Sequence, residues 1–534
     1  MNTARAASMA SLGVVVMAAG RGTRMQSNHA KVLHRIAGRP MIHYALDVAR
    51  HVAGHSVAVV VGHQADAVRQ AVDSALSGPR DGAPVHIVEQ TQQLGTGHAV
   101  LQARPVFVSG KGKLPAAYLI LNGDTPLLQE TTVQELLRVH HASGATVTML
   151  TALLDDPSGY GRVVRRAAVR TQDGLSASGD VVKIVEHRDA TPEERAIREI
   201  NVGTYVVDGG FLFAALDKVE PHNAQGEYYL TDIVDMAVTQ GHRVSAMALR
   251  NPDEGLGVNT RQQLADAEGV IRQQIRARWL EAGVTMVDPS STWIEAGVVI
   301  GQDTILHPHV TLEGLTVIGE GTTVYSGVRI SDCVVGNRVE ILDHCVLHES
   351  QIDDEAHIGP FVHLRPGVRV RQKAKVGNFV EMKKTDLGEG AKANHLSYLG
   401  DATIGKGVNI GAGTITCNYD GVHKHRTVIG DHVFIGSDTQ LVAPVTIGAG
   451  TVIAAGTTVT QDVPSDSLVI ARVQQVTRAG WAAKRRALQA GGTRETKHVK
   501  GETASARLAP RVSPVTKKQP LNSKGKPVKK RTRG

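Results

Sequence analysis

The chain has 534 residues, of which 42% are hydrophobic, 21% charged and 3% aromatic. Single hydrophobic cores stop growing at roughly 250–300 residues, so we expect two or three folded units. The composition indicates a soluble globular protein, and it excludes a membrane span because no apolar run approaches the ~20 residues that a membrane helix needs. With so few aromatic side chains, Val, Ile and Ala must fill the cores.

The net charge of +8 comes from one end of the chain. From Trp481 to Gly534 there are 16 Lys or Arg residues and 2 acidic ones, which leaves 43 basic and 49 acidic residues before that point. The body is therefore mildly acidic. We predict that residues 481–534 form a basic, disordered tail. Such a tail is more often simply solvated than bound to nucleic acid or an acidic surface, so no nucleic-acid partner is expected.

The three cysteines, Cys333, Cys345 and Cys417, are too few and too scattered for a disulfide framework or a zinc site. This favours a reducing cytoplasm. The early apolar run Leu12–Ala19 is short and ends in a Gly-Arg-Gly-Thr-Arg turn instead of a cleavage site. We interpret it as a buried first strand.

From Leu12 to about Asn259, short apolar runs alternate with segments whose apolar residues recur at helical spacing. The alternation predicts a Rossmann-like α/β domain with a mainly parallel sheet. Ligands on such sheets bind beyond the carboxyl ends of the strands, so the loops there should carry the chemistry. The predicted strands are Val14–Ala18, Val57–Val61, Val85–Val88 and Tyr118–Leu121, and the predicted helices are Pro40–His51, Ala65–Ala75 and Glu130–His141.

The segment from Thr260 to about Met286 keeps helical spacing, which predicts a connecting helix. After it, aliphatic residues recur every six positions and are often followed by Gly, as in Ile358-Gly359. Period six predicts a β-helix of hexapeptide repeats, because neither a helix nor an ordinary strand has that period. Its two clearest runs are Ile352, Ile358, Leu364, Val370, Val376 and Met382, and Ile429, Ile435, Leu441, Ile447, Ile453 and Val459.

The six-residue register is interrupted twice. One interruption falls in Glu381–Leu399, and the other is an insertion between Thr416 and Ile429 that contains Cys417 and the sequence Asn-Tyr-Asp-Gly. Because interruptions in a solenoid become surface loops, we predict two loops here and look for a site in each.

A candidate phosphate site follows the first predicted strand. Gly20 and Gly22 would let backbone N–H groups approach phosphate oxygens, and Arg24 and Lys31 would neutralise a triphosphate and the departing pyrophosphate. The segment matches neither the GxxxxGK[ST] loop nor the GxGxxG fingerprint. By itself it is equally compatible with an ordinary turn.

A candidate Mg²⁺ site comes from two further loops. Asp124 follows a very apolar predicted strand, and Asn259 offers a carbonyl oxygen near the start of the connecting helix. Mg²⁺ takes one or two protein oxygens beside phosphate and water, so these two would suffice. The alternative for Asp124 is a turn residue at a strand end.

Several long motifs, found in order between about Leu12 and Trp481, identify a resemblance. They are AAGRGTRM, QLGTGHA, GYGRVVR, IVEHRDA, QGEYYLTDI, GNFVEMKK and NIGAGTITCNYDG. The chain resembles the bacterial bifunctional enzymes that are both N-acetylglucosamine-1-phosphate uridylyltransferases and glucosamine-1-phosphate N-acetyltransferases. The resemblance implies acetyl transfer from acetyl-CoA to glucosamine-1-phosphate, then Mg²⁺-dependent transfer of UMP from UTP with release of pyrophosphate, in synthesis of a cell-envelope precursor.

For the uridylyl site the resemblance assigns roles to individual residues. Asp124 and Asn259 would hold Mg²⁺, Gly161, Glu186 and Asn201 would bind the N-acetylglucosamine part, and Arg24 and Lys31 would be catalytic. The nucleotide contacts are Met17, Ala18, Ala19, Gly20, Lys31, Gln90, Gly95, Thr96, Asn122, Gly123 and Asp124. Here His29-Ala30 replaces the family's usual Leu-Pro before the lysine, and Asn122-Gly123 precedes the aspartate where the family usually has Tyr-Gly or a similar pair. We expect both changes to be tolerated.

For the acetyl site the resemblance implies a left-handed β-helix that forms trimers with sites between subunits. His395 would be the base and Glu381 would orient its ring. The acceptor sugar phosphate would be bound by Arg365, Lys383, Tyr398 and Asn409, and acetyl-CoA by Ala412, Asn418, Tyr419, Ser437, Ala455 and Arg472. Any one of 24 histidines is more often structural, and Lys383 alone fits a solvated charge equally well.

The predicted organisation is a uridylyltransferase domain over residues 1–261, a linker helix over 262–282, an acetyltransferase β-helix over 283–480 and the tail. Two alternatives stay open on sequence alone. One is a related sugar-phosphate nucleotidyltransferase and acyltransferase of other specificity, and the other is a non-catalytic trimeric scaffold. The intact Asp124, Asn259, Glu186 and His395 favour the bifunctional enzyme.

Overall fold

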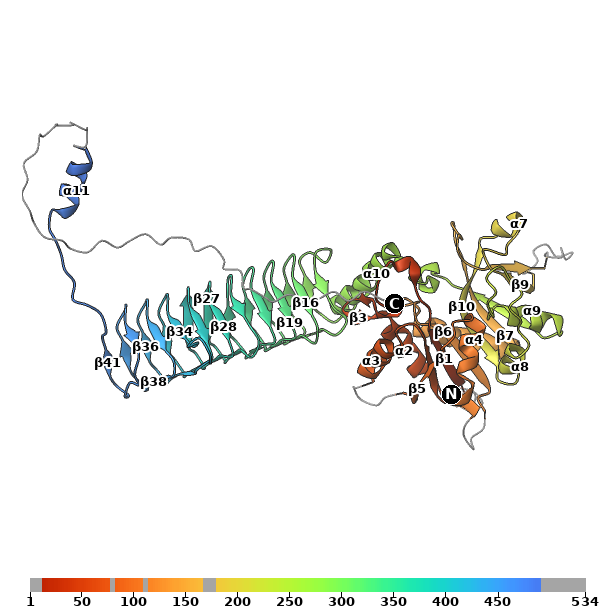
Figure 1. The fold of residues 1–534 in the computed structure, drawn as a ribbon, viewed down its shortest axis with the longest axis horizontal. Coiled ribbons are helices and arrows are strands. Elements are labelled where there is room, and N and C mark those ends of the chain that lie inside the picture. Colours follow the sequence, from red (N-terminus) through yellow and green to blue (C-terminus); the bar gives the residue numbers. More distant parts are fainter. Residues whose placement is uncertain (1–11, 77–81, 109–113, 167–178, 491–534) are drawn as a thin grey trace, which may run out of the picture. The chain divides into compact units, whose positions relative to one another are not determined.

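The computed structural model describes residues 12–76, 82–108, 114–166 and 179–490. The chain divides into two compact units, one up to Arg472 and one from Val473 onward. The larger unit contains an α/β domain, the helix α10 and a β-helix (Figure 1). Within the described ranges, no helix is both long and apolar enough to cross a membrane.

The α/β domain is built on one twisted sheet, whose main path runs β11-β7-β10-β6-β1-β4-β5. Strands β1, β4, β5 and β6 are parallel to one another, while β10 runs antiparallel to both β6 and β7. The strands are β1 Leu12–Ala18, β4 Val57–Val61, β5 Val85–Glu89, β6 Ala117–Asn122, β7 Val147–Leu153, β8 Arg162–Arg165, β9 Val181–Val185, β10 Glu199–Asp208 and β11 Val244–Ala248.

Helices cover both faces of this sheet because the central strands are apolar on both sides. Val14 and Val16 belong to one core with α2, α3 and α6, whereas Val15 belongs to a second core with α4, α5, α8 and α9. The helices are α2 Met41–Val52, α3 Ala65–Ala75, α4 Thr96–Gln102, α5 Arg104–Val108, α6 Glu130–Ser143, α7 Pro192–Arg195, α8 Leu212–Leu216 and α9 Asp232–Thr239, with 3-10 helices η1 Thr23–Met25, η2 Lys31–Leu33 and η3 Pro252–Gly255. The predicted doubly covered α/β sheet is confirmed.

The strand order reverses at β1, which lies between β4 and β6. Chains leaving neighbouring strands diverge at such a point and leave a crevice beyond the carboxyl ends. The loops after β1, β5 and β6 therefore surround one opening. A short antiparallel hairpin, β2 Arg35–Ile36 and β3 Arg39–Pro40, follows η2 in the chain.

Helix α10, Arg261–Glu281, begins with a reciprocal cap in which Thr260 and Gln263 each accept from the other's backbone N–H. Its buried residues Ala267, Ile271 and Ile275 share one hydrophobic core with Ile36 and with the first coils of the β-helix. The α/β domain, α10 and the β-helix are thus joined by continuous apolar packing.

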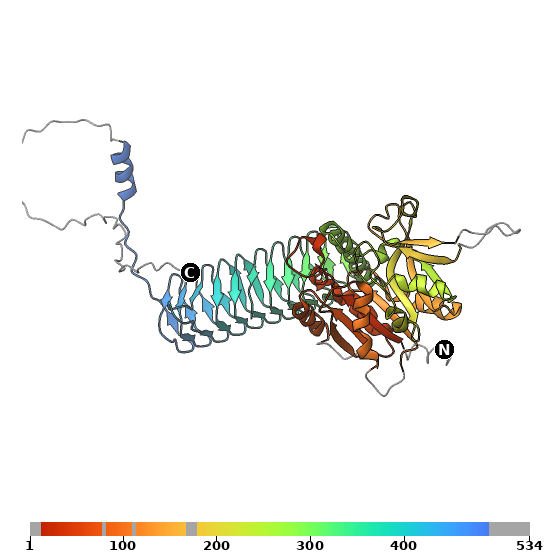
Figure 2. The ribbon, with the colours of Figure 1, turned by 45° about the vertical axis from the view of Figure 1, so that its right-hand side comes forward.

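The β-helix consists of short parallel strands in which each strand pairs with the third strand onward (Figure 2). In most strands the first residue is exposed and the second is buried, as with Val299 at 51% and Ile300 at 4% exposure. The buried residues stack along the axis, and buried threonines between them return their hydroxyls to backbone carbonyls, as Thr304 does to Gly319. The predicted left-handed β-helix of hexapeptide repeats is confirmed.

The strands fall into three side sheets. The first comprises β12 Thr285–Met286, β15 Ile305–Leu306, β18 Thr323–Val324, β21 Glu340–Ile341, β24 His357–Ile358, β27 Lys375–Asn378, β30 Lys392–His395, β33 Asn409–Ile410, β36 Phe434–Ile435, β39 Val452–Ile453 and β41 Leu468–Val469. The second comprises β13 Trp293–Ile294, β16 Thr311–Glu313, β19 Arg329–Ser331, β22 Val346–His348, β25 His363–Leu364, β28 Glu381–Lys383, β31 Tyr398–Gly400, β34 Ile415–Cys417, β37 Gln440–Val442 and β40 Thr458–Val459. The third comprises β14 Val299–Ile300, β17 Val317–Ile318, β20 Val334–Val335, β23 Gln351–Ile352, β26 Arg369–Val370, β29 Asp386–Leu387, β32 Ala402–Ile404, β35 Thr427–Ile429 and β38 Val445–Ile447.

The two predicted interruptions have different outcomes. The insertion after Thr416 forms a loop between β34 and β35, as predicted. The prediction of a loop in Glu381–Leu399 is wrong, because the change there is one five-residue step from Met382 to Leu387, both fully buried. Strands on either side stay in register, so the solenoid absorbs the missing residue without a surface loop.

The structure also differs from the predicted tail at its start. Trp481–Ala490 forms the helix α11, in which every residue is exposed. Alanine, leucine, lysine and arginine are strong helix formers, and this composition outweighed the lack of an apolar face. Residues 491–534 lie outside the described residues.

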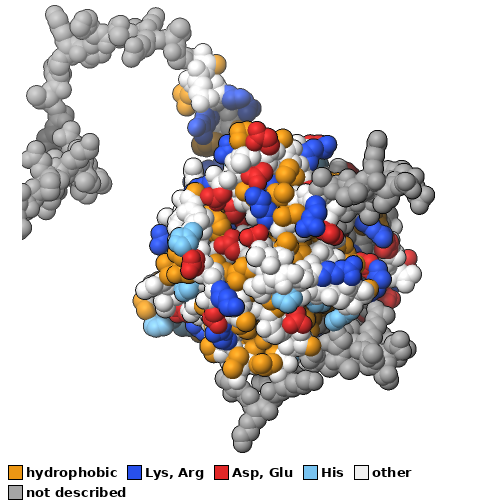
Figure 3. All heavy atoms as spheres, turned by 90° about the vertical axis from the view of Figure 1, so that its right-hand side faces the viewer, with side chains coloured by type: hydrophobic (Ala, Val, Ile, Leu, Met, Phe, Trp, Pro, Cys, Tyr) orange, Lys and Arg blue, Asp and Glu red, His pale blue; other side chains and the backbone are white. Residues whose placement is uncertain are grey.

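On the face of the α/β domain in Figure 3, basic and acidic side chains are interspersed.

The stacking of buried aliphatic residues predicts a large difference between two neighbouring leucines. Leu312 is fully buried and Leu315 is 76% exposed. We expect Leu312→Ala to lower the free energy of unfolding by about 2–5 kcal/mol and Leu315→Ala to change it by less than about 0.5 kcal/mol. Thermal melts of the two variants and the parent measure this, and equal shifts would contradict the packing.

Candidate functional site

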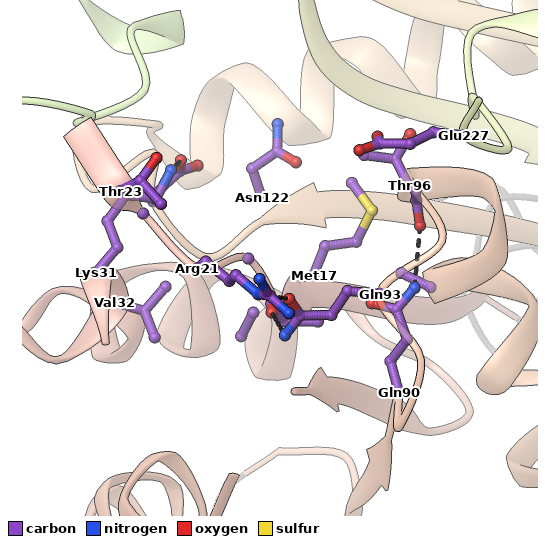
Figure 4. A pocket seen from close by; sticks show the side chains of 17 residues that line it. Met17, Arg21, Thr23, Lys31, Val32, Gln90, Gln93, Thr96, Asn122 and Glu227 are labelled. Carbon is purple, nitrogen blue, oxygen red and sulfur yellow. Dashed lines mark hydrogen bonds and ion pairs between the residues drawn. The ribbon is translucent and has the colours of Figure 1, made fainter. Parts of the chain in front are cut away.

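A cavity of about 570 Å³ opens at the reversal point of the α/β sheet. Figure 4 shows Lys31 and Thr23 on one side of it and Gln90, Thr96 and Glu227 on the other, with Arg21 and Gln93 between them. The cavity collects most of the predicted nucleotide contacts. Its lining is Met17, Ala18, Ala19, Gly20, Arg21, Gly22, Thr23, Lys31, Val32, Gln90, Gln93, Gly95, Thr96, Ala99, Asn122, Asp124 and Glu227.

The glycines in the turn after β1 allow close backbone approach. Gly22 has φ +61°, and a Cβ there would lie 2.6 Å from the Lys31 Cβ. Gly123 after β6 donates its N–H to the Met17 carbonyl at 2.9 Å, and a Cβ on Gly123 would lie 3.0 Å from the same oxygen. These contacts hold the β1 and β6 loops against each other, so both reach the cavity.

The opposite wall comes from the loop after β5. The Gln90 side-chain amide donates to the Gly95 carbonyl at 3.0 Å, and the Thr96 hydroxyl accepts from the Leu230 N–H at 3.0 Å. Gly95 has φ +112°, and a Cβ placed on it would lie 2.6 Å from the Tyr228 carbonyl oxygen. The loop is therefore fixed in place before any ligand binds.

Arg21, Gln93 and Glu227 are polar residues of this cavity that sequence reasoning missed. Arg21 donates from Nε to the Gln93 side-chain oxygen at 2.7 Å, and Gln93 in turn donates to the Ala19 carbonyl at 3.1 Å. Glu227 lies opposite them. All three belong to motifs already quoted, and each lies within three residues of a predicted position or of the QGEYYLTDI start. Polar side chains of these types are common on protein surfaces, so no separate signal in the sequence marked them as part of a site.

The predicted metal ligands meet at one point. The Lys31 ammonium donates to the Asn259 side-chain carbonyl at 3.0 Å and also to the Asp124 carboxylate. The Val258 N–H donates to the Asp124 carbonyl at 2.9 Å, which ties the two loops together. Two oxygens that both reach one cationic nitrogen are a donor set that fits a hard divalent cation, because Mg²⁺ takes carboxylate and carbonyl oxygens.

The structure also brings together the three predicted sugar residues. The Asn201 N–H donates to the Gly161 carbonyl at 2.9 Å, and a Cβ on Gly161 would lie 3.4 Å from a Glu186 carboxylate oxygen. Burial raises the pKa of the Glu186 carboxyl, a hydrogen bond from Thr231 acts the other way, and nearby acidic side chains raise it further. One of these neighbours is Asp232, whose own pKa burial raises to about 6.

Arg24 does not line the cavity. It is exposed on η1, and its guanidinium lies 4.0 Å from the Cβ position of Gly159. Burial and the Asp124 carboxylate raise the pKa of the adjacent Tyr160 hydroxyl, and Arg24 lowers it. Arg24 therefore faces the loop between the metal ligands and the sugar residues.

Five of the predicted acetyl-transfer residues follow one corner of the β-helix on successive coils. Leu396 follows His395, and its carbonyl accepts from the Gly413 N–H at 3.1 Å. On later coils, Asp438 N–H donates to Ala412 at 2.7 Å and Gly456 N–H to Ser437 at 2.8 Å. Arg472 continues the series by donating to the Ala455 carbonyl at 2.6 Å. We call His395, Ala412, Ser437, Ala455 and Arg472 the corner column.

A group of cations lies on the neighbouring side sheet. Lys424 lowers the pKa of the Lys383 ammonium most, and Arg365 adds to this. Three positive side chains within interaction range repel one another, so an anion such as a phosphate would be favoured between them. Lys424 was missed by sequence reasoning, because only the fold brings the insertion next to Lys383.

Glu381 does not contact the ring that it was expected to orient. In the described residues it accepts from Arg365 at 2.8 Å, and its strand pairs with Tyr398. His395 ends β30, in a different side sheet. The prediction that Glu381 fixes the His395 tautomer is therefore corrected within this chain: Glu381 pairs with Arg365 instead.

Tyr398 and Asn409 lie on strands next to β30, which ends at His395: Tyr398 begins β31, the next strand in the chain, and Asn409 is on β33, which pairs with β30. The Tyr398 hydroxyl lies 2.6 Å from the Cβ position of Gly400, so its ring folds over that glycine. Asn409 begins β33 and pairs with Lys392 of the strand that ends at His395. Both side chains are partly exposed, as a substrate-binding surface requires.

The insertion loop is held by its own hydrogen bonds. Asn418 donates to the Asp401 carboxylate at 2.6 Å. Asp420 accepts from the backbone of His423 and Val422 and pairs with His425 at 2.7 Å, and these bonds hold its pKa far below the usual range. The loop presents Tyr419, 59% exposed, to solvent. Cys417 precedes it and has no assigned role.

These features define a nucleotidyltransferase joined to a hexapeptide-repeat acyltransferase. Residues 14–186 match the MobA-like NTP transferase domain, and residues 426–461 match the bacterial transferase hexapeptide (six repeats).

Relatives matched over nearly their whole length give the family. The proteins called "Bifunctional protein GlmU" from Pelobacter propionicus and Trichlorobacter lovleyi are each 50% identical to this chain, over 89% and 90% of it and 98% and 99% of their own length. That of Geobacillus thermodenitrificans is 45% identical over 88% of this chain and 98% of its own. The chain belongs to the family of bifunctional GlmU proteins. It is an enzyme of UDP-N-acetylglucosamine synthesis with uridylyltransferase and acetyltransferase activities, acting on small-molecule substrates.

The buried Glu186 predicts a pH-dependent stability difference. Its folded-state pKa is raised above its unfolded value, so ionisation opposes folding once the pH exceeds the unfolded pKa of about 4.3. Glu186→Gln should melt with the parent below about pH 4 and melt higher than the parent at about pH 8. Thermal melts at the two pH values test this.

Glu199 is the matched control. Burial raises its pKa, but hydrogen bonds from Arg165 and Thr151 together with the Arg165 charge lower it below the usual value. The sign is therefore opposite, and Glu199→Gln should melt lower than the parent at about pH 8. Parallel behaviour of the two variants would show that burial of Glu186 does not govern the effect.

Proposed function

We propose that the cavity at the β-sheet reversal is the uridylyl-transfer site and that the corner column is the acetyl-transfer site. The observation that carries the first assignment is the convergence of Lys31, Asp124 and Asn259 at the edge of the cavity. In this proposal the chain first acetylates glucosamine-1-phosphate and then transfers UMP to the product.

In the uridylyl reaction, a phosphate oxygen of N-acetylglucosamine-1-phosphate attacks the α-phosphorus of UTP. The bond to the bridging oxygen breaks, and pyrophosphate leaves. Lys31 would neutralise the transferring phosphates and Arg24 would approach them from η1, while Glu186 and Asn201 would hold the sugar. No covalent enzyme intermediate is required, so the residues act by positioning and charge neutralisation.

The oxygens of Asp124 and Asn259 that accept from Lys31 support a requirement for Mg²⁺. Asp124 and Asn259 would hold the ion, and Lys31 would then turn its ammonium toward the phosphates. When bound, Mg²⁺ supplies charge that stabilises the polyphosphate.

In the acetyl reaction, the sugar amine attacks the thioester carbonyl of acetyl-CoA. His395 accepts the proton that the nitrogen loses, and the CoA thiolate leaves and is protonated. Arg365, Lys383 and Lys424 would bind the acceptor phosphate, and the later coils of the corner column would bind CoA.

We also propose a homotrimer. His395, Ser437, Ala455 and Arg472 are all exposed in the single chain, as is Tyr419 on the insertion loop. An acetyl-transfer site must exclude water to favour the amine, so a neighbouring subunit would complete it. The proposed boundaries are residues 1–261, 262–282, 283–480 and the tail 481–534, and the proposed location is the cytoplasm, consistent with Cys333 and Cys345 as buried free thiols.

The two sites should fail independently. We expect Asp124→Ala to lower uridylyl transfer by at least about a hundredfold and to leave acetyl transfer within about twofold, because the sites use separate residues. His395→Ala should do the reverse. Pyrophosphate and free CoA are measured separately with UTP, acetyl-CoA and glucosamine-1-phosphate. Full activity of either variant at its assigned site would refute that assignment.

A shared site between subunits predicts complementation. His395→Ala and the double variant Asn418→Ala/Tyr419→Ala should each be inactive in acetyl transfer. If the insertion loop serves the neighbouring subunit, co-expression should restore activity, because some sites then receive an intact base and an intact loop. If the loop serves its own subunit, every site keeps one defect and no activity returns. The uridylyl activity of each variant serves as the control for folding.

A further inference from the structure

The segment that carries Lys31 packs against two parts of the molecule, because Val32 and Leu33 contact the α/β core while the residues after them reach the core of α10. We call Lys31–Pro40 the lysine segment; it comprises η2, β2 and β3. Ile36 and Ala37, both essentially unexposed, belong to the hydrophobic core that runs through α10 and the β-helix, not to the cores of the α/β sheet. The position of Lys31 therefore depends on α10 as well as on the α/β core.

Ala37 is the most constrained residue of the lysine segment. Its φ is +45°, in the left-handed region that side chains with a Cβ rarely adopt. Both of its backbone polar groups are bound outside the segment: its N–H donates to the Glu268 carboxylate at 2.8 Å, and its carbonyl accepts from the Ala296 N–H at 3.0 Å. A left-handed alanine persists only where its surroundings determine it.

Glu268 has no hydrogen-bond partner for its second oxygen among the described residues. Its Oε2 accepts from Ala37, while its Oε1 is buried and without a partner. Leaving a carboxylate oxygen buried and unbound is unfavourable. The placement is therefore not explained by the stability of α10 alone, and the contact with Ala37 is its clearest use.

The other half of the Lys31 contact is fixed to the same helix. Asn259 donates its N–H to the Gln263 side chain at 2.8 Å, at the start of α10. Arg261 contacts the His34 ring at 3.3 Å, three residues after Lys31. Helix α10 thus contacts both the lysine segment and the residue that bonds to Lys31.

We propose that Glu268 is a positioning residue for uridylyl transfer. By holding Ala37 in its left-handed conformation, it fixes the lysine segment so that Lys31 meets Asp124 and Asn259. The proposal rests on the uridylyl site assigned above. Glu268 itself would touch no substrate atom and would act only through Lys31.

The test uses the full-length chain with three variants. Glu268→Ala removes the acceptor, Glu268→Gln keeps a carbonyl oxygen that accepts from Ala37, and Asp266→Ala removes an exposed acid on the same helix whose contact is with Gln262. We expect Glu268→Ala to lower the uridylyl kcat about tenfold, since small misplacements of a catalytic group are costly, with KM for UTP changed much less. The other two should stay within about twofold.

A double-variant cycle separates positioning from general stability. In a Lys31→Ala background, Glu268→Ala should lower the uridylyl kcat by no more than about twofold, because its effect passes through Lys31. Acetyl transfer and the thermal midpoint are followed in each preparation. If Glu268→Ala also abolishes acetyl transfer, Glu268→Asp, which keeps the charge but is one methylene short, replaces it.

The outcomes distinguish this inference from the site assignment. Full uridylyl activity of Glu268→Ala beside an impaired Lys31→Ala overturns the positioning role alone. An equal loss in Glu268→Gln and Glu268→Ala also overturns it, since charge and not the hydrogen bond would then matter. Additive losses of uridylyl kcat in the double-variant cycle would also overturn the positioning role. Full activity of Lys31→Ala would instead refute the uridylyl site.

Discussion

The contact of Lys31 with Asp124 and Asn259 joins three segments that are far apart in the sequence. Each reaches the contact for a separate reason: Asp124 ends the strand beside β1, Asn259 precedes α10, and Lys31 follows the glycine turn that leaves β1. The cavity at the sheet reversal has this form only while all three are held. Much of the remaining structure provides that support.

Helix α10 links this contact to the β-helix. Its buried face shares a core with the lysine segment and with the first coils of the solenoid. The β-helix can serve as such a base because its interior is a continuous stack of aliphatic side chains with few degrees of freedom. An attachment of this kind would make the geometry of the proposed uridylyl site sensitive to the first coil, although the corner column lies many coils further along.

The β-helix places its own chemistry by repetition. Equivalent corner positions recur on successive coils, so residues separated by irregular sequence intervals, such as Ala412 and Ser437, become neighbours. The insertion loop changes the interval without changing the corner. It also brings Lys424 to Lys383, across a distance in sequence that no local pattern records.

The sequence by itself determined the two architectures, because periodicity is a direct consequence of which side chains must be buried: alternating apolar runs for the sheet and a six-residue step for the solenoid. It also determined the strand-end residues Gly20 and Asp124, since chemistry at parallel strands lies beyond their carboxyl ends. The tertiary structure alone decided contacts between distant segments. It assigned Glu381 to Arg365, Ala37 to Glu268 and Lys424 to Lys383, and it absorbed one register slip without a loop. Such pairings depend on the relative placement of coils and domains, which burial patterns within one segment do not encode.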